Sequence, residues 1–360
     1  MISNKNFELE WIKTTSAKLG RKGDPKMLEK VIYALTLLEQ LKVHGLDLIF
    51  KGGTSILLAT DPPRRFSIDI DIITTASSED IEVVLGKIVA SGLFLNWSAD
   101  KDRKQVIEAP VAHYKIYYQS KVNQHFGEEP ILLDVLFSEN PYPALQDQQI
   151  AHSWLHQEGE PLTISLPSFE SILGDKLTAF APNTTGILYS KNRPVEIIKQ
   201  LYDIGFLFDR SSDLKIIKAS YQRIVQEEIG FRNLEMDWPG PLEDTFNTCF
   251  LLALRETKSE EFKHLQLGIR NIVNFIIDRF TIDEAIVAGA KTAYLCSLLL
   301  NEDKSTINRF TSPEQVRTIE IADPKYNKLN KLKKTSPEAF FYWQMAIILK
   351  TQMYERRDFN

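Results

Sequence analysis

Cysteine is scarce in this sequence, because the 360 residues include only Cys249 and Cys296. These two residues lie far apart and no C-x-x-C spacing occurs. A disulfide framework and a thiolate zinc site are therefore excluded. We interpret both side chains as small buried hydrophobic groups, which fits a reducing cytoplasm.

Long apolar runs are absent as well. The most apolar stretch near the C-terminus, residues 295–300, is flanked by charged residues and is too short to cross a bilayer. The first residues of the chain mix polar and charged side chains and lack the apolar core of a signal peptide. We therefore expect a cytoplasmic protein with no membrane role.

The chain has no excess of positive charge, since 43 Lys and Arg stand against 48 Asp and Glu and leave a net charge of −5. This balance argues against a strongly basic nucleic-acid-binding protein and is compatible with a local basic patch. The most basic segment, residues 325–334, could follow a phosphate backbone, with Tyr326, Tyr342 and Trp343 available to stack a base. A solvated helix face is the alternative interpretation.

Two common nucleotide-binding motifs and one hydrolase motif are missing. Neither the P-loop spacing nor the G-x-G-x-x-G fingerprint occurs, so the Walker-type ATPase and Rossmann dehydrogenase classes lose support. The absence of a G-x-S-x-G nucleophile elbow likewise argues against an α/β-hydrolase.

The hydrophobic pattern changes type along the chain. A helix is expected over residues 25–43, because Asp24 and Pro25 form a typical start and apolar residues then recur at helical spacing. Strands are expected over 48–51, 67–72, 106–109, 113–118, 131–137 and 162–166. Helices are expected over 169–180, 194–208, 213–228, 243–255, 258–280 and 282–300.

These patterns predict an α+β protein of two domains, which its length also favours. Residues 1–165 are expected to form a small mixed sheet flanked by helices, and residues 166–360 a mainly helical bundle.

Two aspartates alternate with isoleucine in segment 67–72. On a strand, Asp69 and Asp71 point to the same face with Cα atoms about 6.6 Å apart, so that both carboxylates can reach one cation or bridge two. Their hard oxygen ligands suit Mg²⁺ or Mn²⁺ bound together with substrate phosphates. A strand with one solvated face is the alternative for an isolated pair of this kind.

A glycine pair, Gly52 and Gly53, separates a short strand from a short helix. Glycine lets the backbone approach a ligand closely, and the first N–H groups of the helix, with the hydroxyls of Thr54 and Ser55, can bind phosphate oxygens. An ordinary turn that needs positive φ is the alternative.

A third carboxylate, Asp134, interrupts the otherwise apolar run 131–137. A lone charge in a central strand costs several kcal/mol, so Asp134 needs a partner. A metal ion shared with Asp69 and Asp71 would supply one, and a paired lysine or arginine is the alternative. Three acids beside a glycine turn form the arrangement that two-metal phosphoryl or nucleotidyl transfer requires.

Segments 51–55 (KGGTS) and 65–71 (RFSIDID) together resemble the signature of the AbiEii/AbiGii toxin family of nucleotidyltransferases, a branch of the DNA-polymerase-β-like superfamily. Segment 174–179 (GDKLTA) resembles the lysine motif of that family, and segment 201–204 (LYDI) resembles its later aspartate motif. The resemblance covers roughly residues 28–210, with four motifs in the right order.

The chain departs from the family pattern at two places. The arginine that often follows the lysine motif closely is delayed to Arg193. Lys199 and Gln200 replace the Arg-Asp pair that commonly precedes Leu-Tyr-Asp.

The resemblance implies an enzyme that depends on Mg²⁺ or Mn²⁺ and moves an NMP from an NTP to an acceptor hydroxyl. RNA is the implied acceptor, with the tRNA 3′ end favoured. The implied biological role is that of a toxin in a toxin–antitoxin or phage-defence system, with an antitoxin from a neighbouring gene as partner. The alternatives are a protein or small-molecule acceptor, or a non-catalytic nucleotide-binding regulatory module.

The expected metal ligands are Asp69, Asp71 and Asp134. By resemblance, Lys176 would contact the nucleotide phosphates and Asp203 would orient that lysine or the substrate. These two residues and the three aspartates form the expected catalytic set. The residues expected to bind the nucleotide are Lys51, Gly52, Gly53, Thr54, Ser55, Arg65, Ser67 and Lys176. The helical domain is expected to complete the cleft for nucleotide and acceptor.

Overall fold

The structure, a computed structural model, describes residues 1–19, 23–100, 109–123, 127–301 and 306–358. The chain divides into two compact units. The first unit comprises Met1–Ser168 and Asn274–Asp278, and the second comprises Phe169–Val273 and Arg279–Asn360. The hydrophobic pattern predicts this change between residues 165 and 166, without a return of the chain to the first unit.

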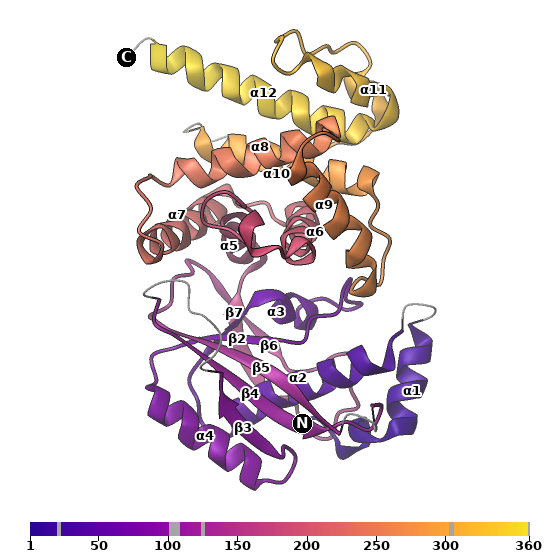
Figure 1. The fold of residues 1–360 in the computed structure, drawn as a ribbon, viewed down its shortest axis with the longest axis vertical. Coiled ribbons are helices and arrows are strands. Elements are labelled where there is room, and N and C mark those ends of the chain that lie inside the picture. The colour runs from indigo at the N-terminus through magenta and orange to yellow at the C-terminus, as the bar shows by residue number, and fades with distance from the viewer. Residues whose placement is uncertain (20–22, 101–108, 124–126, 302–305, 359–360) are drawn as a thin grey trace. The chain divides into compact units, whose positions relative to one another are not determined.

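Within the described residues, the first unit contains a mixed sheet of seven strands in the order β3-β4-β5-β2-β1-β7-β6 (Figure 1). The strands are β1 Ile49–Lys51, β2 Ile70–Thr74, β3 Asn96–Ala99, β4 Val111–Gln119, β5 Glu128–Phe137, β6 Leu145–Gln149 and β7 Thr163–Pro167. Its helices are η1 Asn4–Phe7, α1 Leu9–Lys18, α2 Pro25–Val43, α3 Gly52–Leu58 and α4 Ser78–Ala90. The predicted mixed sheet with flanking helices is thereby confirmed.

Strand β2 lies inside the sheet, parallel to β5 and antiparallel to β1. The antiparallel pairs β3–β4 and β4–β5 extend the sheet on one side, and β7 and β6 extend it on the other. Strands β3 and β6 were not predicted, because edge strands such as β6 (LQDQQ) carry little apolar patterning. Residues 106–108 of a predicted strand lie outside the described residues.

One face of the central strands is the apolar core. Phe50, Ile72 and Val135 are cross-strand neighbours on β1, β2 and β5, and all three are buried. They belong to the same hydrophobic cluster as Leu35 of α2 and Leu85 of α4. Because successive strand residues alternate in direction, the residues that flank this row face the other side of the sheet.

Helix α2 begins as the sequence predicts. The Asp24 carboxylate accepts a hydrogen bond from the Lys26 backbone N–H, and Pro25 occupies the first turn. The helix ends before Gly45, whose φ of +82° lies in the left-handed region.

The second unit is helical, which confirms the predicted helical C-terminal region. Its α-helices are α5 Phe169–Ala179, α6 Pro194–Arg210, α7 Leu214–Phe231, α8 Pro239–Leu254, α9 Glu260–Asn271, α10 Ile282–Leu300, α11 Leu332–Thr335 and α12 Pro337–Asp358. Short 3₁₀ helices are η3 Tyr189–Lys191, η4 Ile272–Asn274, η5 Pro313–Val316 and η6 Asn327–Lys331.

The prediction of one helix over 258–280 is wrong in its second half, because the chain leaves α9 and returns to the first unit. There the Phe66 N–H donates to the Phe275 carbonyl at 2.7 Å. Arg64 forms an ion pair with Asp278 at 2.8 Å. These contacts with a distant segment override the local helical periodicity.

Both cysteines are buried free thiols, as expected. No helix among the described residues is long and apolar enough to cross a membrane.

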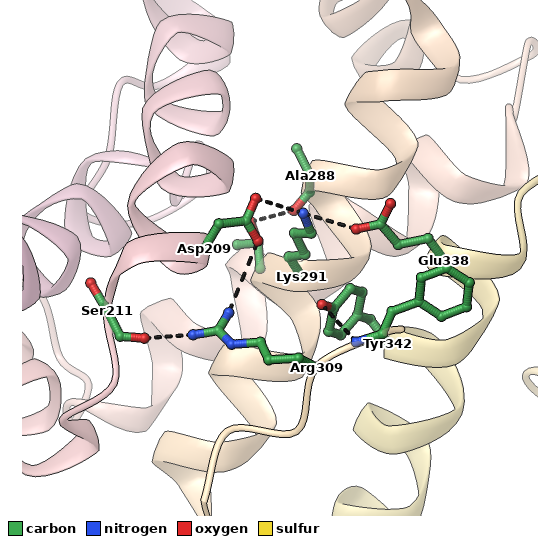
Figure 2. Close-up of polar contacts among 9 residues, drawn as sticks. Asp209, Ser211, Ala288, Lys291, Arg309, Glu338 and Tyr342 are labelled. Atoms are coloured by element: carbon green, nitrogen blue, oxygen red, sulfur yellow. Dashed lines mark hydrogen bonds and ion pairs between the residues drawn. The ribbon is translucent and has the colours of Figure 1, made fainter. Parts of the chain in front are cut away.

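A charge cluster ties three elements of the second unit together (Figure 2). The Lys291 ammonium on α10 lies 2.8 Å from the Asp209 carboxylate on α6 and 2.9 Å from the Glu338 carboxylate on α12. Arg309 lies 4.0 Å from Asp209 and donates to the Ser211 carbonyl. Burial lowers the pKa of Lys291, but the hydrogen bonds and charges of the two carboxylates outweigh burial and raise that pKa above its usual value.

Removal of the two carboxylates should lower the free energy of unfolding more than removal of the lysine. The Lys291 side chain is only 10% exposed, whereas Asp209 and Glu338 are 45% and 36% exposed and can be hydrated without it. We expect the double variant Asp209→Ala, Glu338→Ala to lower the free energy of unfolding by about 3–5 kcal/mol, because it leaves the buried Lys291 ammonium without its two carboxylate partners. We expect Lys291→Met to lower it by about 1–2 kcal/mol. Urea denaturation at pH 7 measures both, and the opposite order would contradict this account.

The cluster should also make stability depend on alkaline pH. Because the folded-state pKa of Lys291 is raised, its stabilising contribution is fully present below the unfolded value of about 10.5 and is lost as the pH rises through the folded value. The difference in unfolding free energy between the wild type and Lys291→Met should therefore persist at neutral pH and shrink above pH 10.5. Denaturation series at several alkaline pH values measure this dependence, and a constant difference would contradict it.

Candidate active site

Four polar residues form a row across neighbouring strands of the sheet. Asp71 on β2 is the cross-strand partner of Lys51 on β1 and of Asp134 on β5. Asp134 is in turn the partner of His113 on β4. Paired residues of neighbouring strands point to the same face, so Lys51, Asp71, Asp134 and His113 share the face opposite the apolar core. The structure thus brings together two of the three predicted metal ligands.

Asp69 lies just before β2, which begins at Ile70. The prediction that Asp69 and Asp71 lie on one strand is therefore wrong by one position. The physical reason is that pairing with β1 begins at Asp71, opposite Lys51, and pairing with β5 begins at Ile70, opposite Leu133, so Asp69 lies before the first pair on either side. The Asp69 carbonyl instead accepts a hydrogen bond of 2.6 Å from the Thr54 hydroxyl, and its side chain is exposed next to Asp71 in the chain.

The glycine turn packs directly against charged side chains. Gly52 has a φ of +78°, and a Cβ atom there would lie 2.0 Å from the Asp71 Oδ2 atom. A Cβ atom at Gly53 would lie 2.3 Å from an Arg65 guanidinium nitrogen and 2.8 Å from the Ser67 Oγ atom. A side chain at either position would displace these groups, and Gly52 also adopts a φ that glycine favours. The turn, Asp71, Arg65 and Ser67 form one packed assembly.

The two hydroxyls of this turn are used within the fold. Thr54 donates to the Asp69 carbonyl, and its Oγ1 atom lies 2.9 Å from the Ser67 Oγ atom. Ser55 donates to the Gly52 carbonyl at 2.8 Å. Both residues are fully buried. These hydroxyls hold the turn against the segment that precedes β2.

Arg65 and Lys51 place positive charge next to the glycine turn. Arg65 is buried, and its guanidinium donates to the Phe66 carbonyl at 3.1 Å. Its backbone pairs with Ile276 in the returning segment. Lys51 is half-buried at the end of β1.

The second unit contains the other two predicted catalytic residues. The Lys176 ammonium on α5 lies 3.0 Å from the Asp203 carboxylate on α6, and the two side chains are only 9% and 3% exposed. Lys176 also donates to the Gln200 side-chain carbonyl at 2.8 Å. The lysine therefore sits in a defined position with two partners on one helix.

Sequence reasoning missed His113 and Gln200 as members of these clusters. The His113 Nδ1 atom lies 2.7 Å from the Asp134 Oδ1 atom, a pairing that the strand pattern alone did not reveal. In the sequence, Gln200 differs from the Arg-Asp pair of the family pattern. Its signal was its position three residues before Asp203, one helical turn away on the same face.

The donor set suits a hard divalent cation. Within the described residues there is no group of three or more His, Cys, Asp and Glu side chains placed to hold a metal ion. Mg²⁺ does not need three protein ligands, because it commonly binds one or two carboxylates and completes its octahedral coordination with water and substrate phosphates. The facing pair Asp71 and Asp134, with Asp69 adjacent, meets that requirement.

The lysine-rich segment 325–334 does not offer an aromatic stacking surface. Tyr326, Tyr342 and Trp343 are all buried, so the expectation that they stack an unpaired base is wrong. They pack inside the helical unit, where Tyr326 and Trp343 make edge contacts with Phe246. Two lysines of the segment donate to backbone carbonyls of neighbouring elements.

The carboxylate pair beside a glycine turn and the buried Lys–Asp pair are the features expected of a nucleotidyltransferase. The family model of the AbiEii nucleotidyl transferase toxin of type IV toxin–antitoxin systems matches residues 36–283. This match covers more than half of the chain. The chain therefore belongs to the AbiEii family of nucleotidyltransferase toxins.

The fold is similar to that of a solved structure, MenT4. MenT4, a nucleotidyltransferase toxin from Mycobacterium tuberculosis, is similar over 93% of this chain and 99% of its own, at 13% identity and a TM-score of 0.51. JHP933 from Helicobacter pylori is matched over 75% of this chain and 89% of its own, at 14% identity and a TM-score of 0.41. The comparison with curated proteins yields no match.

Substitution of Gly52 should disturb the Asp71 carboxylate. We expect Gly52→Ala to lower nucleotidyl transfer at least about tenfold, because the new methyl group displaces Asp71 from its position. Gly92→Ala is the matched control: Gly92 has a φ of +86° and nothing within 4 Å, so this variant carries only the backbone strain of about 1–2 kcal/mol. Activity assays and thermal melts of both variants measure the effects. Equal activity in the two variants would contradict the packing argument.

Variants of the Lys176–Asp203 pair should affect the free energy of unfolding and the transfer activity differently. We expect Asp203→Leu alone to lower the free energy of unfolding by about 3–5 kcal/mol, because it leaves a buried ammonium without its counter-charge. The double variant Lys176→Met, Asp203→Leu should recover much of that stability and remain inactive. Lys263→Ala, which breaks the exposed pair with Glu260 on α9, is the control and should lower the free energy of unfolding by about 0.5 kcal/mol. An active double variant, measured by the transfer assay, would remove Lys176 from the catalytic set.

Proposed function

We propose that this protein is a metal-dependent toxin that transfers an NMP from an NTP to a hydroxyl of RNA, with the tRNA 3′ end as the favoured acceptor. The observation that carries the proposal is the pair of carboxylates Asp71 on β2 and Asp134 on β5, of which Asp71 packs against the Gly52–Gly53 turn. Membership of the AbiEii family supports the transfer of nucleotides and a partner antitoxin. The similarity of fold to MenT4 is consistent with this class. We expect the reaction to take place in the cytoplasm.

Asp69, Asp71 and Asp134 are the proposed ligands of Mg²⁺ or Mn²⁺. When bound, the metal ions supply positive charge that stabilises the attacking and leaving oxygens of the reaction. The support for this assignment is the cross-strand pairing of Asp71 with Asp134 and the hard oxygen chemistry of all three side chains.

The remaining proposed residues bind the nucleotide phosphates or hold the groups that bind them. Gly52 and Gly53 allow the backbone to approach the phosphates, and the charges of Lys51, Arg65 and Lys176 neutralise them. Asp203 holds Lys176 in position through the 3.0 Å ion pair. The residues Thr54, Ser55 and Ser67 support the shape of the turn through their hydrogen bonds.

The proposed reaction is an in-line displacement. The acceptor hydroxyl oxygen forms a bond to the α-phosphorus while the bond from that phosphorus to the β-phosphate oxygen breaks. Pyrophosphate leaves, and Asp134 helps to remove the hydroxyl proton. Protein or small-molecule acceptors use the same steps, and a non-catalytic regulatory module would bind the NTP without them.

Asp71→Asn should abolish transfer and preserve the fold. The test incubates the purified protein with Mg²⁺, total cellular RNA and each NTP in turn, labelled at the α-phosphate, and resolves the products on a gel. We expect label on a tRNA-sized band with the wild type, and a loss of about a hundredfold or more in Asp71→Asn or with a chelator. Asp147→Asn, an exposed aspartate on β6, is the matched control and should remain active.

Each other result has a defined meaning. Label on protein would move the proposal to a protein acceptor. Binding of an NTP without any label would favour the regulatory module. Full activity in Asp71→Asn would remove the carboxylate row from the mechanism.

A further inference from the structure

We propose that His113 is a positioning residue that orients the Asp134 carboxylate toward the metal ion. This inference rests on the proposed function, because it assigns a role to a neighbour of one proposed metal ligand. It starts from a contact that the sequence motifs do not include.

The contact between His113 and Asp134 is short and well defined. The His113 Nδ1 atom lies 2.7 Å from the Asp134 Oδ1 atom. An ionised carboxylate can only accept a hydrogen bond, so the imidazole donates from Nδ1. The distance falls in the range of hydrogen bonds that are strengthened by charge.

The sheet register makes this contact possible. His113 on β4 and Asp134 on β5 are direct cross-strand partners, and Asp134 is also the partner of Asp71 on β2. Asp134 therefore has His113 on one side and the second proposed metal ligand on the other. The next residue on the same face of β4, Lys115, forms its ion pair with Asp100 at 3.0 Å.

The pair reaches solvent and is not sealed into the core. The side chains of His113 and Asp134 are 16% and 21% exposed. A carboxylate with this exposure retains access to ions from solution. Since it offers about four acceptor positions, the hydrogen bond from His113 restrains its rotation and leaves capacity for other partners.

Residues that hydrogen-bond to metal ligands determine how those ligands point. Loss of such a partner typically lowers metal affinity or activity by about 10–100-fold. Without His113, the Asp134 side chain would gain rotational freedom that metal binding must then remove. His113 should therefore affect metal affinity without itself touching the metal.

The experiment measures Mn²⁺ binding to the full chain by electron paramagnetic resonance of the free ion. We expect His113→Ala to weaken Mn²⁺ binding by about 10–100-fold. His113→Asn keeps an N–H donor near the position of Nδ1 and should bind Mn²⁺ within about threefold of the wild type, whereas His113→Gln places its donor farther out and should resemble His113→Ala. His44→Ala, at the end of α2, is the histidine control and should bind Mn²⁺ as the wild type does.

The comparison of Asn with Gln keeps the test decisive if His113→Ala fails to fold, since both variants retain a polar side chain. Equal affinity in the Asn and Gln variants would overturn the positioning role. So would unchanged affinity in His113→Ala when Asp134→Ala loses binding, and that result would leave the proposed function intact. If neither Asp134→Ala nor Asp71→Ala weakens Mn²⁺ binding, the proposed metal site itself fails and the inference falls with it.

Discussion

The register of β2 between β1 and β5 is the constraint on which the candidate active site depends. It places Asp71 opposite both Lys51 and Asp134. A slip of β2 by one residue would turn Asp71 into the apolar core and bring Ile70 and Ile72 out to the polar face. The burial of these two isoleucines therefore holds the Asp71 carboxylate on the polar face. Core packing and site geometry follow from the same pairing.

The glycine turn and the returning segment fix the remaining parts of this site. Gly52 and Gly53 lie so close to Asp71 and Arg65 that any side chain on the turn would displace them. From further along the chain, Asn274–Asp278 pairs with the residues on both sides of Arg65. The segment around Arg65 is thus held by the glycine turn and by a segment about two hundred residues away in sequence.

Two buried lysines of the second unit differ in how their partners are arranged. Lys291 and Lys176 each have partners on neighbouring helices. Lys291 joins three elements and stabilises the unit, because its two carboxylate partners lie on different helices. Both partners of Lys176, Asp203 and Gln200, lie on one helix and hold the ammonium in one orientation. A residue held in this way is suited to present a charge to a ligand.

The sequence by itself determined the features that depend on neighbouring residues. These include the start of α2, the positive φ at Gly52, the alternation that separates Asp71 from the core, and the motifs that define the family. Only the tertiary structure decided that Asp69 lies outside β2, that His113 bonds to Asp134, and that Gln200 joins Lys176. The physical reason is that strand register and helix packing depend on contacts between distant residues, which local periodicity does not encode.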